Sequence, residues 1–295
     1  MSRIATIGFF DGVHRGHQYL FEQLRRIADE RHLQPLIVTF EQHPREVLQA
    51  DFIPQLLTTP AERKALLEQY GEVIMLPFEE VQPLTAAQFM RRLKEEYDVQ
   101  VILMGYDHRF GSDGLKHPHE YRALGAETGI EVLTMNEYVE GEWHVSSTEI
   151  RRALENGNVV VAAELLGRPY ELSGTVVHGR GIGRSLGFPT ANIAPENTHK
   201  ILPRAGVYSV RVTTSAMTQR PAMLNIGTNP TVGNETQTIE VHIPSFEGDL
   251  YGERMNVLFK RFIREEKKFG SLQELQEQIK ADVDSSLRRD ADLRG

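Results

Sequence analysis

The sequence contains no cysteine. Disulfide bonds and thiolate zinc sites are therefore excluded, and this composition fits the reducing environment of the cytoplasm. Long apolar runs are also absent, because no stretch reaches the roughly 20 consecutive apolar residues that a membrane-spanning helix needs. Residues 1–7 do not show the charged segment, apolar core and cleavage site that together mark a secretory signal. We therefore expect a cytoplasmic protein without a membrane partner.

An excess of positive charge is missing as well. The formal net charge is -8 at pH 7, which opposes general attraction to nucleic acid or to an anionic membrane. We therefore expect no nucleic-acid partner, and we expect anions to be bound by local clusters of donors. The 295 residues, of which 40% are hydrophobic and 25% charged, fit a globular chain of two domains. These features leave the number of subunits open.

Apolar runs and helical patterns alternate through the first half of the chain. Five short runs have the length and apolar character of buried strands, at residues 4–7, 36–40, 73–76, 99–104 and 130–134. Between the first two runs, Leu20, Leu24 and Ile27 share one helical face that can pack on a sheet. This alternation predicts an α/β domain with a doubly wound parallel sheet.

Two short helices and a junction are expected in the middle of the chain. Ser146 and Glu149 have capping-box spacing, which predicts the start of a helix. A second helix is expected at residues 159–166, directly before a Gly-Arg-Pro-Tyr junction. We place the boundary in this junction, which gives an amino-terminal domain of residues 1–168 and a carboxy-terminal domain of residues 169–295.

Apolar and polar residues alternate with a period of two in the second domain. The segments 208–212 and 239–243 each place three apolar residues on one face and polar residues on the other. Several such segments, separated by Gly, Pro and Asn turns, predict an antiparallel sandwich or barrel. Near the carboxy terminus Leu272, Leu275 and Ile279 share one helical face after a second capping box. We expect the domain to finish with a helix that lies on the sheet.

Residues 8–17, with the sequence GFFDGVHRGH, combine glycine and histidine directly after the first expected strand. A turn at Gly12 and a helix beginning near His17 would place backbone N–H groups and a positive helix end beside two imidazoles. Gly16, between His14 and His17, lets a phosphate approach the backbone. The segment is therefore a candidate anion site, in which the imidazoles would stabilise the charge on a departing pyrophosphate.

Two other interpretations of this segment stay open on the residues alone. His14 and His17 would be ordinary surface residues of a loop if no ligand binds there. They would instead bind a metal ion together with Asp11 if a further ligand were available, but none follows at a suitable spacing.

Residues 179–192, with the sequence GRGIGRSLGFPTAN, form a second candidate phosphate site. Four glycines interleaved with two arginines can form a loop whose amides and guanidinium groups bind phosphate, although a turn-rich hairpin would show the same spacing. The segment is not a P-loop, because no Gly-Lys-Ser/Thr follows. Thr190 and Asn192 project to one face of an extended segment, where their oxygens suit Mg²⁺. Glu240 lies on the polar face of a later strand, where a glutamate is ordinarily just solvated.

Three further segments give the first half a resemblance to a known family. Together with residues 8–17, the segments 39–48 (TFEQHPREVL), 104–111 (MGYDHRFG) and 145–151 (VSSTEIR) resemble the adenylyltransferase motifs of the bacterial bifunctional riboflavin kinase/FMN adenylyltransferases, often called FAD synthetases. The resemblance implies a Rossmann-like nucleotidyltransferase domain in which Asp107 and Arg109 lie at the flavin nucleotide and ATP. On the residues alone, these two side chains could equally form an ion pair in a polar loop. The resemblance implies ATP binding by a larger set: Gly8, Phe10, Gly12, His14, Gly16, His17, Ser147, Thr148 and Arg151.

The second domain resembles the riboflavin kinase module of the same family. The resemblance rests on the segments 187–193, 225–231, 239–243 and 248–252. It implies a compact six-stranded antiparallel β-barrel, ATP binding by Gly181 and Gly183, and ligation of Mg²⁺ and nucleotide by Thr190 and Asn192. Glu240 would be the general base and a flavin contact at the riboflavin 5′-hydroxyl.

The resemblance covers almost the whole chain and implies an enzyme of FAD biosynthesis. Riboflavin would attack the γ-phosphate of MgATP to give FMN, and FMN would then attack the α-phosphate of a second ATP to give FAD and pyrophosphate. Glu240 would act in the first step, and His14 and His17 in the second. Three positions depart from residues common in the family: Phe9 in place of asparagine, Gln42 in place of proline and His108 in place of an aromatic residue.

Two other functions stay open on the sequence alone. The first domain could be a nucleotidyltransferase for a pantetheine or nicotinamide phosphate, with the barrel serving only for recognition, but the intact GFPTAN segment argues against this. The chain could also be a flavin-binding carrier without turnover, since the presence of catalytic groups does not establish catalysis. Incubation with MgATP separates these functions, because a carrier would bind flavin without converting it.

Overall fold

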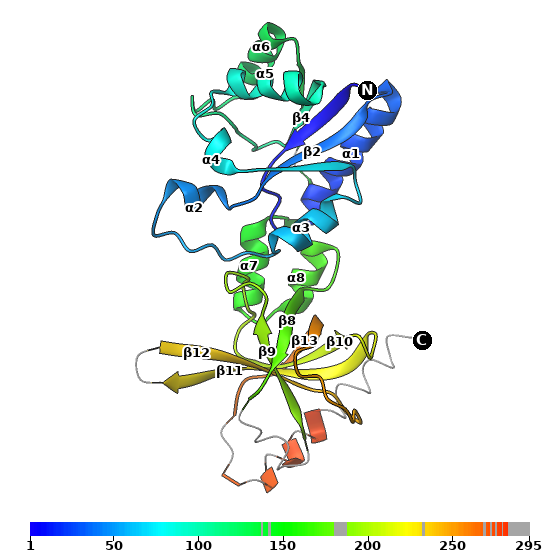
Figure 1. Ribbon diagram of the computed structural model, residues 1–295, viewed down its shortest axis with the longest axis vertical. Coiled ribbons are helices and arrows are strands. Elements are labelled where there is room, and N and C mark those ends of the chain that lie inside the picture. The colour runs from blue at the N-terminus through cyan, green and yellow to red at the C-terminus, as the bar shows by residue number, and fades with distance from the viewer. Residues whose placement is uncertain are drawn as a thin grey trace. The chain divides into compact units, whose positions relative to one another are not determined.

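The computed structural model describes residues 1–136, 138–140, 143–179, 188–231, 234–267, 270–271, 273–274, 276–278 and 280–282. These residues divide into two compact units, residues 1–147 and 148–295. Each unit has its own sheet (Figure 1). The two units are described separately.

The first unit contains a parallel five-stranded sheet with the strand order β3-β2-β1-β4-β5. Each of the five apolar runs forms a strand, so the predicted doubly wound α/β domain is confirmed. Strands and helices alternate along this unit: β1 (Arg3–Ile7), α1 (Arg15–Arg31), β2 (Gln34–Phe40), α2 (Pro44–Leu48), α3 (Pro60–Leu67), β3 (Glu72–Leu76), α4 (Phe78–Val81), α5 (Ala86–Tyr97), β4 (Val99–Met104), α6 (Pro118–Thr128) and β5 (Glu131–Thr134).

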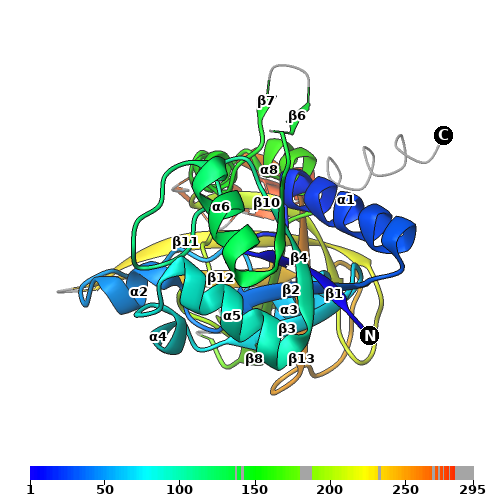
Figure 2. The same cartoon turned by 90° about the horizontal axis from the view of Figure 1, so that it is seen from above.

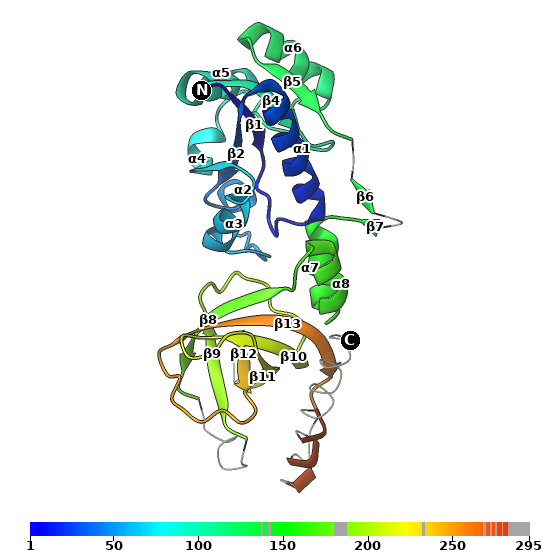
Figure 3. The same ribbon diagram turned by 90° about the vertical axis from the view of Figure 1, so that its right-hand side faces the viewer.

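Helices cover both faces of this sheet because alternate strand residues point to opposite sides. Ala5 and Ile7 of β1 pack in one apolar cluster with Phe89 of α5. Ile4 packs in a second cluster with Phe21 of α1. Figure 3 shows α1 and α5 on opposite sides of the strands. The carboxyl ends of β1, β2 and β4 are left for the loops that carry the candidate site.

Two short strands, β6 (Val139–Glu140) and β7 (Trp143–His144), pair with each other outside the five-stranded sheet (Figure 2). The helix that follows them, α7 (Ser147–Glu155), is the one that the capping-box spacing predicts. The next helix, α8 (Val159–Leu166), ends at Gly167 with φ 72°, a left-handed conformation that glycine adopts without strain.

The second unit is built on a closed six-stranded antiparallel barrel with the order β10-β11-β12-β9-β8-β13. Of the sandwich or barrel predicted from the residues, the barrel is therefore correct. Alternate residues of β12 point inward, and Ile239 and Val241 are 3% and 1% exposed. The barrel strands are β8 (Glu171–Val177), β9 (Thr190–Pro195), β10 (Gly206–Thr213), β11 (Arg220–Thr231), β12 (Asn234–His242) and β13 (Arg254–Arg264).

Helices α7 and α8 pack with the barrel in the second unit. Arg204 donates its backbone N–H to the carbonyl oxygen of Leu154 at 3.0 Å. A Cβ added at Gly157 would lie 3.3 Å from the Tyr208 hydroxyl. By packing, the units therefore divide at Ser147/Thr148, and the domain boundary at residues 168/169 stays a prediction. The helix expected at the carboxy terminus is seen in residues 273–274, 276–278 and 280–282, whereas Leu272, Leu275 and Ile279 lie outside the described residues.

Candidate functional sites

The loop between β1 and α1, residues 8–14, has a tightly turned backbone. Phe10, Gly12 and Val13 have φ values of 54°, 81° and 43°. Left-handed torsion is costly for residues with a branched or aromatic side chain, so the surrounding contacts must impose it. Backbone strain of this kind is common where a loop is preorganised for a ligand.

Asp11 supplies many of those contacts. Its buried carboxylate accepts hydrogen bonds from the backbone N–H groups of Leu57 and Thr58 and from the Thr58 hydroxyl, at 3.0 to 3.1 Å. The same hydroxyl oxygen is 3.0 Å from the Gly12 backbone nitrogen, which donates to it. Asp11 thus joins the loop to residues 57–58. Among the described residues, no group of three or more His, Cys, Asp or Glu side chains could hold a metal ion, so the interpretation of Asp11 as a metal ligand gains no support.

His14 and His17 lie at the start of α1. The helix begins at Arg15, two residues earlier than expected, because His14 is its N-cap: His14 Nδ1 accepts a hydrogen bond from the His17 backbone N–H at 3.4 Å. The two imidazole rings stack with their centroids 3.5 Å apart and an angle of 19°. Only 6% of His14 is exposed, which contradicts the interpretation of this residue as an ordinary surface histidine. Both rings lie at the positive end of a 17-residue helix, where anions are stabilised.

Two glycines pack closely against the aromatic rings of this loop. A Cβ at Gly16 would lie 3.2 Å from Cε1 of His14. A Cβ at Gly8 would lie 2.6 Å from Cε1 of Phe10. The Phe10 ring packs edge-on against His17, with the centroids 5.2 Å apart, and is 6% exposed. Of the residues expected to bind ATP, Phe10 therefore supports His17 with its side chain.

The remaining predicted residues of the adenylyltransferase site lie in α7. The Ser147 hydroxyl donates to the backbone carbonyl oxygen of Asp11 at 2.9 Å, so Ser147 contacts the loop of residues 8–14. Thr148 is exposed and Arg151 half-buried in the first turns of α7. These two residues belong to the second unit.

Asp107 and Arg109 lie in the loop after β4 and are both exposed. No ion pair joins the two within the described chain, so the alternative of a structural pair is not supported. Between them, His108 turns a ring nitrogen, Nε2, into the protein, where it has no hydrogen-bond partner among the described residues. Burial lowers the pKa of His108 to about 4, so its imidazole is neutral at pH 7.

The barrel brings together the three residues predicted for the kinase site. In the register of β12 with β9, Glu240 pairs with Asn192 and His242 with Thr190. Directly paired residues point to the same face. The Thr190 hydroxyl is 3.4 Å from Glu240 Oε2, to which it donates. This face is the outer one, because the alternate residues Ile239 and Val241 fill the barrel interior.

Gly179 begins the glycine-rich loop and is the only one of its four glycines that the structure describes. A Cβ at this position would clash with the side-chain amide of Asn192. Gly181 and Gly183 lie outside the described residues, as do the two arginines of the loop.

Asn225 and Glu266 were not identified from the sequence as parts of this site. Asn225 of β11 pairs with Glu240 from the side opposite to Asn192. Its amide Nδ2 donates to Oε1 of Glu266 at 3.5 Å. The position of Asn225 at the start of the segment 225–231 was a usable signal, whereas Glu266 follows β13 in a charged run and carried none.

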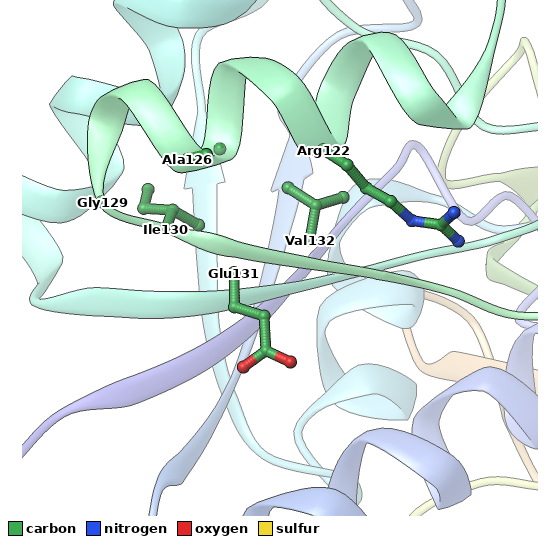
Figure 4. A pocket seen from close by; sticks show the side chains of 7 residues that line it. Arg122, Ala126, Gly129, Ile130, Glu131 and Val132 are labelled. Carbon is green, nitrogen blue, oxygen red and sulfur yellow. The ribbon is translucent and has the colours of Figure 1, made fainter.

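The first unit also contains a hollow outside its candidate site. It has a volume of about 450 Å³ and is lined by α6 and β5 (Figure 4). Its polar side chains are engaged elsewhere: Arg122 donates to the Thr134 hydroxyl, and Glu131 pairs with Arg31. The hollow shares no residue with the predicted sites.

No described helix has both the length and the apolar character needed to span a bilayer.

Comparison with known proteins places each unit in a family. Residues 1–149 match the family model of FAD synthetase, and residues 166–289 match that of riboflavin kinase. The bifunctional riboflavin kinase/FMN adenylyltransferase of Escherichia coli (strain K12) is 37% identical over 283 residues, which are 95% of this chain and 90% of that protein. The enzyme of the same description from Bacillus subtilis (strain 168) is 35% identical and covers 99% of this chain and 93% of its own length.

One solved structure has a similar fold along almost the whole chain. It is described as a macrolide-efflux protein from Streptococcus pneumoniae, and it shares 33% identity and a TM-score of 0.89 over 97% of this chain and 93% of its own. Two family models on one chain, each on a unit with the matching architecture, and relatives covered almost end to end leave a single assignment. The chain belongs to the family of bifunctional riboflavin kinase/FMN adenylyltransferases.

Proposed function

We propose that the chain converts riboflavin to FAD at two separate sites, with residues 8–17 acting in adenylyl transfer and the outer face of β9 and β12 acting in riboflavin phosphorylation. The main support is that each unit brings together the groups that one step needs. Stacked imidazoles lie at a helix start in the first unit, and Glu240 lies beside Thr190 and Asn192 in the second. Both steps transfer phosphorus groups, for which positioning and charge neutralisation provide most of the catalysis.

In the kinase step, Glu240 accepts the proton of the riboflavin 5′-hydroxyl as that oxygen attacks the γ-phosphate of ATP. The bond between the γ-phosphorus and the β-phosphate oxygen breaks, and ADP leaves. The Glu240 carboxylate is half-buried and the Thr190 hydroxyl is its neighbour. A hydroxyl, an amide and a carboxylate oxygen on one face form a donor set that suits Mg²⁺. When bound, Mg²⁺ neutralises phosphate charge. Thr190 and Asn192 would hold it.

In the adenylyl step, the phosphate of FMN attacks the α-phosphate of ATP. FMN needs no general base, because its phosphate is already anionic at pH 7. His14 and His17 stabilise the negative charge of the departing pyrophosphate, with help from the helix dipole of α1. The Ser147 hydroxyl holds the Asp11 carbonyl and so keeps the loop in place.

The two-site assignment is tested with two variants. His14→Ala combined with His17→Ala should abolish FAD formation from FMN and leave riboflavin phosphorylation within about twofold, whereas Glu240→Gln should do the reverse. Each variant is incubated with MgATP and either riboflavin or FMN, and the flavins are separated by chromatography. The activity that survives in each variant reports folding of the unit that was not changed, and the melting profile reports folding of the unit that was changed. This control matters because loss of the His14 cap costs α1 about 1 kcal/mol.

Two outcomes would contradict the proposal. Parallel loss of both activities in a folded double-histidine variant would show that the two steps share these residues. Binding of riboflavin by the unmodified chain without conversion by MgATP would show a carrier in place of an enzyme.

A further inference from the structure

Arg63 of α3 is a fully buried arginine that neither catalytic step uses. Its side chain is 0% exposed. Its Nη2 donates to the carbonyl oxygens of Phe40 and Glu41, which end and follow β2. In the part of the chain that the structure describes, its Nε and Nη1 have no hydrogen-bond partner. A buried guanidinium with two such nitrogens is costly, so its charge calls for an explanation.

The Arg63 guanidinium stacks on the loop that leads to the paired histidines. Its Cζ lies 4.0 Å from the centre of the Phe9 ring, within the range of a cation–π contact. The Phe9 carbonyl oxygen in turn accepts from the Thr39 hydroxyl at 3.1 Å. Arg63 thus connects the end of β2 with the first residue of the turn that orients His14 and His17.

The charge of Arg63 also acts on Asp11. Burial lowers the pKa of Arg63 to about 10, and attraction to Asp11 opposes that shift. The Arg63 guanidinium is therefore charged at pH 7. The Asp11 carboxylate is 4% exposed and lies within the loop of residues 8–14, so its negative charge works against the binding of a triphosphate there. A cation beneath the same loop offsets that repulsion.

A purely structural role would not require a charge. An apolar side chain of similar volume would fill the same space without the desolvation penalty, and such replacements of buried charges are often neutral or stabilising. Phe9, the aromatic neighbour, could pack against a methionine equally well. The cation at this position is explained by its effect on an anion that binds to the loop of residues 8–14.

We propose that Arg63 is a positioning residue of the adenylyl-transfer site, which fixes Phe9 against the end of β2 and offsets the charge of Asp11 so that the loop accepts the phosphates of ATP. This inference rests on the proposed function of residues 8–17. It adds a residue from outside all the segments that resemble the family motifs.

The test compares Arg63→Met, which removes the charge, with Arg63→Lys, which keeps it. Arg63→Met should raise the KM for ATP in FAD formation about tenfold, because the loop loses the cation that offsets the charge of Asp11. Arg63→Lys should keep that KM within about twofold and lower kcat, because a lysine retains the charge and loses the planar stack. Arg92→Met, on α5, is the matched control: Arg92 pairs with Glu80 and Glu96 on the surface, and its loss should change neither constant.

Riboflavin phosphorylation by the same variants reports folding of the second unit, and the melting profile reports that of the first. A folded Arg63→Met variant with unchanged kcat and KM would overturn the inference. An equal rise in the KM for ATP in Arg63→Met and Arg63→Lys would also overturn it. That result would show that the packing of the Arg63 side chain matters and its charge does not. If Arg63→Met does not fold, Phe9→Leu is the deciding variant, because it removes the aromatic ring under the guanidinium and keeps the charge of Arg63. It should lower kcat and leave the KM for ATP unchanged. A raised KM for ATP would contradict the role of the charge. Failure of the unmodified chain to form FAD would refute the proposed function itself.

Discussion

The backbone of Gly179 lies against the side-chain amide of Asn192 so closely that no Cβ fits between them. The side chain of Asn192, a proposed ligand of Mg²⁺ in the kinase site, must therefore move in Gly179→Ala. A displacement of about 1 Å can lower a rate about 100-fold, and we expect a loss of that order in riboflavin phosphorylation. FAD formation from FMN should be unchanged. Val160→Ala, at an exposed valine of α8 in the same unit, is the control. Equal activity of Gly179→Ala and the unmodified chain would refute the close fit.

Gly16→Ala should separate activity from stability in the first unit. Alanine favours the helical conformation by about 1 kcal/mol over glycine, so the melting temperature should not fall. The new Cβ would lie 3.2 Å from the His14 ring and should disturb its stacking on His17. We expect FAD formation to drop about tenfold. Steady-state kinetics with FMN and scanning calorimetry measure the two effects, and a variant that is more stable and fully active would show that the stacking does not matter.

His108 should make the first unit sensitive to mild acid. Its pKa is lowered to about 4 by burial, whereas an unfolded histidine titrates near 6.5. The unfolded chain therefore takes up the proton first as the pH falls. The stability that neutral His108 provides is complete above about pH 6.5 and is lost as the pH falls toward 4.

His108→Phe should remove this loss. Between pH 7 and pH 5 we expect the melting temperature of the variant to fall about 3 °C less than that of the unmodified chain. His119→Phe, at an exposed histidine of α6, is the matched control and should behave like the unmodified chain. Identical pH profiles for all three proteins would contradict the burial of His108.

The ion pair between Arg264 and Asp282 should stabilise the second unit. Arg264 Nη2 lies 2.8 Å from Asp282 Oδ2, and the two side chains are 21% and 5% exposed. Asp282→Ala leaves a partly buried guanidinium without this partner, which costs about 3 kcal/mol in comparable sites. Denaturant unfolding measures the loss. Glu247→Ala, at an exposed loop residue, should leave the midpoint unchanged, and a similar result for Asp282→Ala would show that the pair contributes little.

The parts of the fold that depend on local patterns could be predicted from the sequence. All five apolar runs became strands of one parallel sheet because a strand covered on both faces must be apolar throughout. The alternation of apolar and polar residues around Ile239 and Val241 correctly predicted a strand there and the face of it that is buried. The same alternation placed Glu240 on the outer face, where it meets Thr190 and Asn192.

The contacts that cross long stretches of sequence could not be predicted. Asp11 is fixed by Leu57 and Thr58, at separations of 46 and 47 residues, and no local pattern links them. The start of α1 was placed two residues late because a histidine N-cap is not among the usual capping residues. Arg63 was not identified, since its helical position is shared with ordinary surface arginines and only its burial sets it apart.

The pairing of β9 with β12 also limits how this enzyme can vary in length. Glu240 and Asn192 meet because they are directly paired in this register, so their side chains lie on the same face of the sheet. Side chains alternate between the two faces along each strand, so a shift of one residue would move either side chain to the other face. Deletion of a single residue within β12 would exchange the solvent-facing and interior faces of the strand. The Glu240 carboxylate would then point into the barrel interior. Natural insertions and deletions in this family should therefore avoid β12 and gather in the turns.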